Sequence, residues 1–218
     1  MWEQNDQRNY ALHKAHQRGQ ICNDSFAAAI TRYAADPRYT TFLEIGTWNG
    51  LGSTKAFADG FAQRSEHYVF YSLECNADKS ADAAALYQHN ASMHILNEVV
   101  WNQQPDDFYE VFPQALDNAL FRKWHDVDIK NMQRCPLFLA RPELPPVFDI
   151  VLLDGGEFTT YYEFQLLKDR CKVLMLDDIL VDKCKRIVAE IKEKPDVWRI
   201  VEENTVRNGY LIAEHIAV

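Results

Sequence analysis

The chain has 218 residues, 47% of them hydrophobic and 25% charged, which fits one globular domain and excludes a disordered or collagen-like chain. Its 32 acidic and 23 basic side chains give a net charge of −9, which disfavours a surface that wraps nucleic acid. No apolar run reaches the roughly 18 residues that cross a bilayer, and the first residues lack the regions of a signal peptide. We therefore expect a cytoplasmic protein with no nucleic-acid or membrane partner and with reduced cysteines.

Helical and strand-like patterns alternate along the chain from about residue 24, which is typical of an α/β sheet. Residues 1–38 are interpreted as an N-terminal helical extension, with a helix cap predicted among residues 23–25. The predicted strands cover residues 41–45, 67–73, 93–96, 147–153 and 172–176. The predicted helices between and after them lie near residues 56–61, 77–88, 158–166 and 180–191.

The last two predicted strands differ from the others because they form a hairpin. Residues 197–201 and 210–213 flank Asn208-Gly209, a pair that favours a tight antiparallel turn. Earlier in the chain, residues 101–146 show weak periodicity and are interpreted as a substrate-side insertion in one domain that spans 1–218. A helix with a long surface loop is the alternative interpretation of that stretch.

Three glycines, Gly46, Gly50 and Gly52, lie within seven residues after the first predicted strand. Glycine allows the backbone to bend and a ligand to approach the main chain, and the following helix presents free N–H groups to an anion. Glu74 ends the second predicted strand beside this loop, where an acid can accept both hydroxyls of a ribose. The glycine spacing is not the Gly-x-Gly-x-x-Gly of nicotinamide-binding proteins. The loop and the acid together predict a nucleotide-cofactor site.

The segment Glu44-Ile45-Gly46-Thr47-Trp48-Asn49-Gly50 resembles the first motif of class I S-adenosylmethionine-dependent methyltransferases. The resemblance covers about residues 40–214 and includes Glu74 as the ribose-binding acid. It implies a Rossmann-like, mostly parallel seven-stranded α/β sheet of order 3-2-1-4-5-7-6, with strand 7 antiparallel and helices on both faces. It further implies that S-adenosylmethionine is bound by Glu44, Gly46, Thr47, Trp48, Gly50, Ser53 and Glu74.

Carboxylates follow two neighbouring strands of this predicted sheet. Asp154 ends the fourth strand, and Asp177 and Asp178 end the fifth. Because parallel neighbours lie about 4.8 Å apart, we expect the three carboxylates to crowd together and to repel unless a cation bridges them. Oxygen ligands favour Mg²⁺ or Mn²⁺ over zinc, so the three residues predict a divalent-cation site. The alternative is that Asp177 or Asp178 only caps the next helix.

This arrangement is similar to that of metal-dependent sugar O-methyltransferases of the macrolide and aminocoumarin biosynthesis type. Catechol O-methyltransferases are less similar, because their second acidic element is usually Asp-Asn, whereas this chain has Asp177-Asp178. We predict catalytic roles for Asp154 and for Glu157, which lies three residues further on and would act as the general base. A first-turn acid favoured by the helix dipole is the alternative role of Glu157.

The sequence therefore favours an S-adenosylmethionine-dependent O-methyltransferase that uses a divalent cation to methylate a hydroxyl of a sugar or glycan. A catechol-type small molecule is the alternative acceptor. A nucleotide-dependent oxidoreductase and a non-catalytic cofactor-binding module are rival interpretations, because the first could use the same glycine loop and Glu74 and the second would keep the glycine loop. Each enzymatic interpretation expects a small-molecule or glycan partner.

Overall fold

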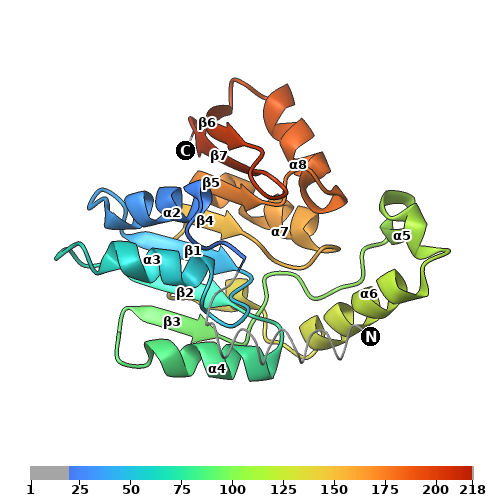
Figure 1. The fold of residues 1–218 in the computed structure, drawn as a ribbon, viewed down its shortest axis with the longest axis horizontal. Helices are drawn as coiled ribbons and strands as arrows, with labels where there is room; N and C mark the ends of the chain where they lie inside the picture. The colour runs from blue at the N-terminus through green and yellow to red at the C-terminus, as the bar shows by residue number, and fades with distance from the viewer. Residues whose placement is uncertain (1–19, 218) are drawn as a thin grey trace.

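The computed structural model describes residues 20–217 and shows a seven-stranded sheet with helices on both of its faces (Figure 1). The strand order within these residues is β3-β2-β1-β4-β5-β7-β6, which confirms the predicted order. Of the predicted N-terminal extension, residues 1–19 lie outside the described part of the chain. The strands are β1 (Thr41–Ile45), β2 (Val69–Leu73), β3 (Met93–Leu96), β4 (Phe148–Leu153), β5 (Cys171–Asp177), β6 (Trp198–Asn204) and β7 (Tyr210–His215).

Strand β4 lies in the middle of the sheet, and all six of its side chains are buried. Burial on both faces explains why its sequence is a nearly continuous apolar run instead of an alternating one. It pairs in parallel with β1 and with β5, and the register aligns Ile45, Leu153 and Leu176 at the carboxyl ends of the three strands. Leu73 of β2 lies beside Ile45. The loops that leave β1, β2, β4 and β5 therefore begin at one common edge of the sheet.

Helices cover both faces of the sheet, because successive side chains of each strand point to opposite sides. The helices are α2 (Ser25–Ala35), α3 (Ser53–Phe61) and α4 (Ala77–Tyr87) on the first face, and α7 (Thr160–Leu167) and α8 (Asp182–Glu193) on the second. Phe42 of β1 packs against Phe57 of α3, whereas its neighbour Leu43 belongs to the cluster that contains Phe164 of α7 and Ile187 of α8. The cap predicted before α2 is Asp24, whose carboxylate accepts the Ala27 N–H at 2.8 Å.

The hairpin predicted near the end of the sheet is present as β6 and β7. Strand β7 lies between β5 and β6 and is antiparallel to both of them. Gly209 adopts a φ of +80° in the turn before β7, and a Cβ there would lie 2.8 Å from the Ile179 side chain. A glycine is therefore required at this position for conformational and for steric reasons.

The stretch 101–146 contains more regular structure than its weak periodicity indicates. Its longest element is α6 (Ala119–Met132), which Asn118 caps by accepting the N–H groups of Leu120 and Phe121. Helix α6 and the short helix α5 (Phe108–Val111) lie to one side of the sheet (Figure 1). The stretch also contains 3₁₀ turns at Pro113–Ala115 and Phe138–Ala140, and a further 3₁₀ turn lies outside it at Lys168–Arg170. Among the described residues, no helix combines the length and the apolar character that a membrane span needs.

Candidate functional site

A cavity of about 610 Å³ opens at the edge of the sheet where β1, β2 and β4 end. Its walls come from the glycine loop after β1, the segments after β2 and β3, the turn after β4, and one side of α6. Open α/β sheets bind ligands at this edge, because loops diverge there. The residues predicted from the sequence that line the cavity are Gly46, Thr47, Trp48, Ser53, Glu74, Asp154 and Glu157.

The glycine loop begins with Gly46, which has a φ of +99°. A Cβ at this position would lie 2.2 Å from the carbonyl oxygen of Asp154, so no other residue fits between the ends of β1 and β4. The N–H groups of Gly46 and Thr47 both donate to the carbonyl of Leu73, at 2.9 and 3.2 Å. These contacts fix the start of the loop against β2 and β4.

Glu74 connects the glycine loop to the end of β2. One of its carboxylate oxygens accepts the Trp48 N–H at 2.8 Å, and the other accepts the Asn76 N–H at 2.8 Å. Trp48 has a φ of +51°, an uncommon conformation for a bulky residue, and this hydrogen bond to Glu74 holds it there. The Glu74 side chain is only 8% exposed, and burial raises its pKa. Glu74 therefore shapes the loop and also presents its carboxylate to the cavity.

Two of the predicted cofactor residues, Glu44 and Gly50, are not among the described residues that line the cavity. Glu44 is fully buried beneath the loop, where it accepts the Thr54 hydroxyl at 2.6 Å and also the Ser72 hydroxyl. Gly50 has a φ of +76°, and a Cβ there would lie 3.0 Å from the Cβ of Ala83 on α4. Glu44 therefore anchors α3 to the sheet, and Gly50 lets α4 pack closely. Their contacts with the cofactor stay predictions.

The amino end of α3 faces the cavity through Gly52 and Ser53. Gly52 is the N-cap residue, and the helix start has no side-chain cap. The first N–H groups of an α-helix lack partners within the helix, and the helix dipole makes this end positive. This end of the cavity therefore suits an anionic group of a ligand.

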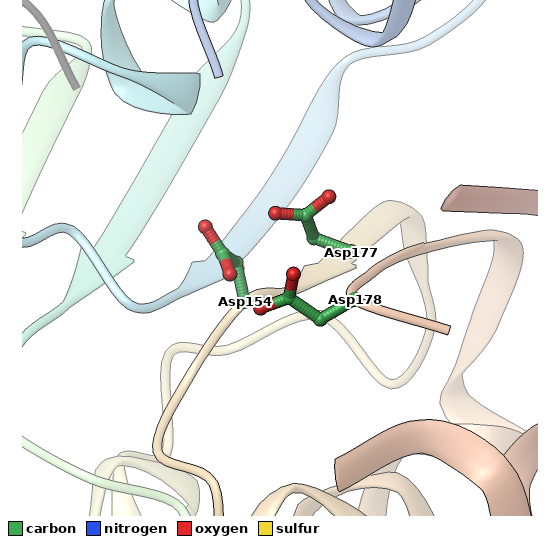
Figure 2. Close-up of side chains that lie close together, drawn as sticks. All are labelled: Asp154, Asp177 and Asp178. Carbon is green, nitrogen blue, oxygen red and sulfur yellow. The ribbon is translucent and has the colours of Figure 1, made fainter. Parts of the chain in front are cut away.

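The three predicted metal ligands lie together at the ends of β4 and β5. Figure 2 shows the carboxylates of Asp154, Asp177 and Asp178 turned toward one another, and one oxygen from each lies within 4.8 Å of the others. Asp178 has a φ of +59°, which turns the chain sharply as it leaves β5. The juxtaposition expected from the sequence is therefore present. Only Asp154 of the three is among the described residues that line the cavity.

The acidic cluster has two cationic partners that the sequence analysis did not identify. The Lys183 ammonium of α8 lies 3.0 Å from Oδ1 of Asp154 and 3.1 Å from Oδ2 of Asp178. The Arg207 guanidinium donates to both oxygens of Asp177, each at 3.0 Å. The sequence does contain a signal that Lys183 is buried. It stands four residues before Ile187, on the apolar stripe of the helix.

Further carboxylates surround the turn that follows Asp154. Glu157 lines the cavity, and burial raises its pKa. Glu163 of α7 and Asp128 of α6 also line it, and burial raises their pKa values to about 7 and about 6. Neither residue was predicted from the sequence, although Glu163 lies on the buried face of its helix between Thr160 and Leu167. This part of the cavity is therefore an acidic environment that favours a neutral or cationic ligand.

Several solved methyltransferases have the same fold. An O-methyltransferase from Bacillus cereus, in complex with S-adenosylhomocysteine, matches 96% of this chain and 89% of its own, with a TM-score of 0.60 and 14% identity. The O-methyltransferase TomG from Streptomyces achromogenes, involved in tomaymycin synthesis and solved with S-adenosylmethionine, matches 93% of this chain and 85% of its own, with a TM-score of 0.57 and 14% identity. A candidate caffeoyl-CoA O-methyltransferase from Staphylococcus aureus matches 97% of this chain and 99% of its own, with a TM-score of 0.55 and 15% identity.

The sequence matches no protein-family model and no curated protein. At 14–15% identity, the structural likeness shows the fold. That fold is the Rossmann-like fold of class I S-adenosylmethionine-dependent methyltransferases, as the motif around Gly46 implied.

Proposed function

We propose that this protein is an S-adenosylmethionine-dependent O-methyltransferase that acts on a hydroxyl of a small molecule. The observation that carries the proposal is a cavity of about 610 Å³ lined by both the glycine loop and Glu74, in the fold that S-adenosylmethionine-bound and S-adenosylhomocysteine-bound enzymes share. The loop that starts at Gly46 and the acid after β2 lie on the same wall.

The residues of this wall fit the functional groups of S-adenosylmethionine. The uncapped amino end of α3, at Gly52 and Ser53, suits the carboxylate of the methionine portion. The two oxygens of Glu74 each accept one backbone N–H, and each oxygen has a second lone pair available for a ribose hydroxyl. Substrate and cofactor would then meet near Asp154, where the end of β4 adjoins Gly46.

When bound, S-adenosylmethionine supplies a methyl group on a positively charged sulfur, which a nucleophilic oxygen can attack in line. Asp154 and Glu157 place negative charge at the wall where that oxygen must lie. Glu157 has a pKa raised by burial, so it accepts a proton more readily than an exposed glutamate does. We assign Glu157 the role of accepting the hydroxyl proton as the oxygen attacks.

A sugar or glycan is the acceptor that we favour. Asp128 and Glu157 line the cavity and can accept hydrogen bonds from neighbouring hydroxyls, while the rings of Trp124 and Phe158 offer apolar surface to a sugar face. A catechol would use the apolar rings but has fewer hydroxyls for the two carboxylates. An acidic acceptor is disfavoured, because the same wall carries Asp154.

The divalent cation expected from the sequence does not fit the acidic cluster as its side chains are arranged. Lys183 and Arg207 already pair with all three aspartates, and both oxygens of Asp177 accept hydrogen bonds from Arg207. A metal ion bound here would compete with the Lys183 ammonium for oxygens of Asp154 and Asp178. The proposed reaction therefore contains no step through a metal ion.

Isothermal titration calorimetry with S-adenosylhomocysteine tests the proposed cofactor. We expect saturable binding of one molecule, weakened roughly tenfold in Glu74→Gln, which loses a charged hydrogen-bond acceptor for the ribose. Glu193→Gln, at an exposed position on α8, is the matched control and should bind like the wild type. Binding of NAD in place of S-adenosylhomocysteine would contradict the proposal and support the oxidoreductase interpretation.

A further inference from the structure

Lys183 holds its ammonium inside the acidic cluster. Its side chain is only 4% exposed, and the ammonium contacts two carboxylates, from Asp154 at the end of β4 and from Asp178 after β5. By contrast, Lys185 on the same helix is 61% exposed and pairs with Asp182. Burying an ammonium is costly unless carboxylates surround it. The position of Lys183 is therefore tied to the cluster itself.

The oxygens of the cluster are already engaged by hydrogen-bond donors from the protein. Lys183 and Arg207 together contact all three aspartates, and the side-chain amide of Asn208 donates to Oδ1 of Asp178 at 3.1 Å. Five of the six carboxylate oxygens thus accept a hydrogen bond. A divalent ion needs most of these oxygens as ligands, because it takes six or more oxygens in total.

The cluster is also set back from the cavity. Asp154 lines the cavity, but Asp177 is 1% exposed, and neither Asp177 nor Asp178 is among the described residues of the cavity wall. A cation that orients an acceptor must keep coordination positions open toward the acceptor. A cation held by all three aspartates would contact the cavity only from the side of Asp154.

We propose that the Lys183 ammonium permanently takes the place of a divalent cation, so that the protein binds neither Mg²⁺ nor Mn²⁺ at Asp154, Asp177 and Asp178. Lys183 is then a positioning residue, because it holds the Asp154 carboxylate at the cavity wall without facing the cavity itself. This role for Asp154 rests on the proposed methyltransferase function. The exclusion of the metal ion does not depend on it.

The test is a titration of the protein with Mn²⁺ alone at 150 mM salt. Electron paramagnetic resonance measures the concentration of the free ion at each step. We expect the wild type to show no stoichiometric Mn²⁺ site. Lys183→Ala removes one positive charge a few ångströms from the ion position, so it should bind one Mn²⁺ at least about a hundredfold more tightly than the wild type. Lys185→Ala removes a lysine from the same helix without changing the cluster, and it should behave like the wild type.

Two further variants connect the result to the cluster. The double variant Lys183→Ala, Asp178→Asn should lose the Mn²⁺ site that Lys183→Ala gains, because it removes one ligand of that site. If Lys183→Ala does not fold, the wild type still decides: a stoichiometric Mn²⁺ site that Asp154→Asn abolishes would overturn the proposal. Lys183→Ala that folds without gaining a Mn²⁺ site would overturn it too. S-adenosylhomocysteine binding, measured in parallel, tests the proposed function independently of either result.

Discussion

Glu163→Gln should change how the stability of this protein depends on pH. Glu163 lies on α7 with 2% of its surface exposed, and its Oε1 accepts the Thr159 hydroxyl at 3.2 Å. Its Oε2 is buried and has no hydrogen-bond partner among the described residues. Burial, aided by the nearby charge of Asp128, raises the pKa of Glu163 from 4.5 to about 7, although the Thr159 hydrogen bond and the Lys183 charge lower it.

The sign and size of the effect follow from this difference in pKa. Below pH 4.5 the Glu163 carboxyl is protonated in both states, so it adds no penalty to folding. Between pH 4.5 and about 7 the unfolded chain releases the proton and the folded protein keeps it, so stability falls as the pH rises. The pKa values of Glu163 in the unfolded and folded states differ by about 2.5 pH units, which corresponds to about 3 kcal/mol of unfolding free energy. The protein has lost this amount once the pH exceeds the pKa of the folded state.

Glutamine keeps the shape and the Thr159 hydrogen bond but carries no charge at any pH. We expect Glu163→Gln and the wild type to have similar free energies of unfolding at pH 4.5, and the variant to be more stable by about 3 kcal/mol at pH 8. Urea unfolding followed by tryptophan fluorescence at four pH values measures this difference, and Glu193→Gln, an exposed acid, is the control. A gap between variant and wild type that stays constant from pH 4.5 to 8 would refute the reasoning.

Two other predictions test the proton acceptor and the acidic cluster. Glu157→Gln should lower kcat by roughly 10²–10⁴-fold with little change in KM, measured as methyl transfer from radiolabelled S-adenosylmethionine. A loss below about tenfold would show that Glu157 does not accept the proton. Arg207→Ala should lower the free energy of unfolding by about 3–5 kcal/mol in urea, because it strands the buried Asp177 carboxylate, and Asp177→Asn in the same chain should recover part of that loss. A loss under about 1 kcal/mol, or no recovery, would contradict this account.

The strand order was implied by the resemblance of the motif around Gly46, and two of its features also have local signals in the sequence. The buried run of β4 indicates a central strand, and Asn208-Gly209 indicates the hairpin that places β7 against β6. The three aspartates could be placed together because each lies at the end of a strand whose neighbours are known once the order is known.

Helix α6 could not be recognised from periodicity, because its inward face contains few apolar residues. Only three of its residues are buried, at His125, Ile129 and Met132, while Asp128 and Asn131 face the cavity instead. A helix that lines a polar cavity on one side and faces solvent on the other loses the hydrophobic pattern that identifies helices.

The ion pairs of the site also lay beyond sequence reasoning. Lys183 and Asp154 are 29 residues apart and come from elements whose facing sides only the folded chain defines. The glycine loop shows a similar limit to what the sequence alone can predict. A glycine at position 50 is consistent with a ligand contact and with close helix packing, and only the folded chain shows that a Cβ there would lie 3.0 Å from the Cβ of Ala83. Side-chain chemistry predicts that a residue needs a partner, but the partner is set by the tertiary fold.

The interior position of β7 sets the order in which the protein can finish folding as it is synthesised. Arg207, just before β7, pairs with Asp24, which lies 183 residues earlier in the chain, and Tyr210 stacks on Phe26 of α2 with ring centroids 4.5 Å apart. Until residues 207–215 have left the ribosome, α2 lacks these contacts, and β5 presents an unpaired edge that other strands can join. A nascent chain that stalls before β7 should therefore depend on chaperones to remain unaggregated.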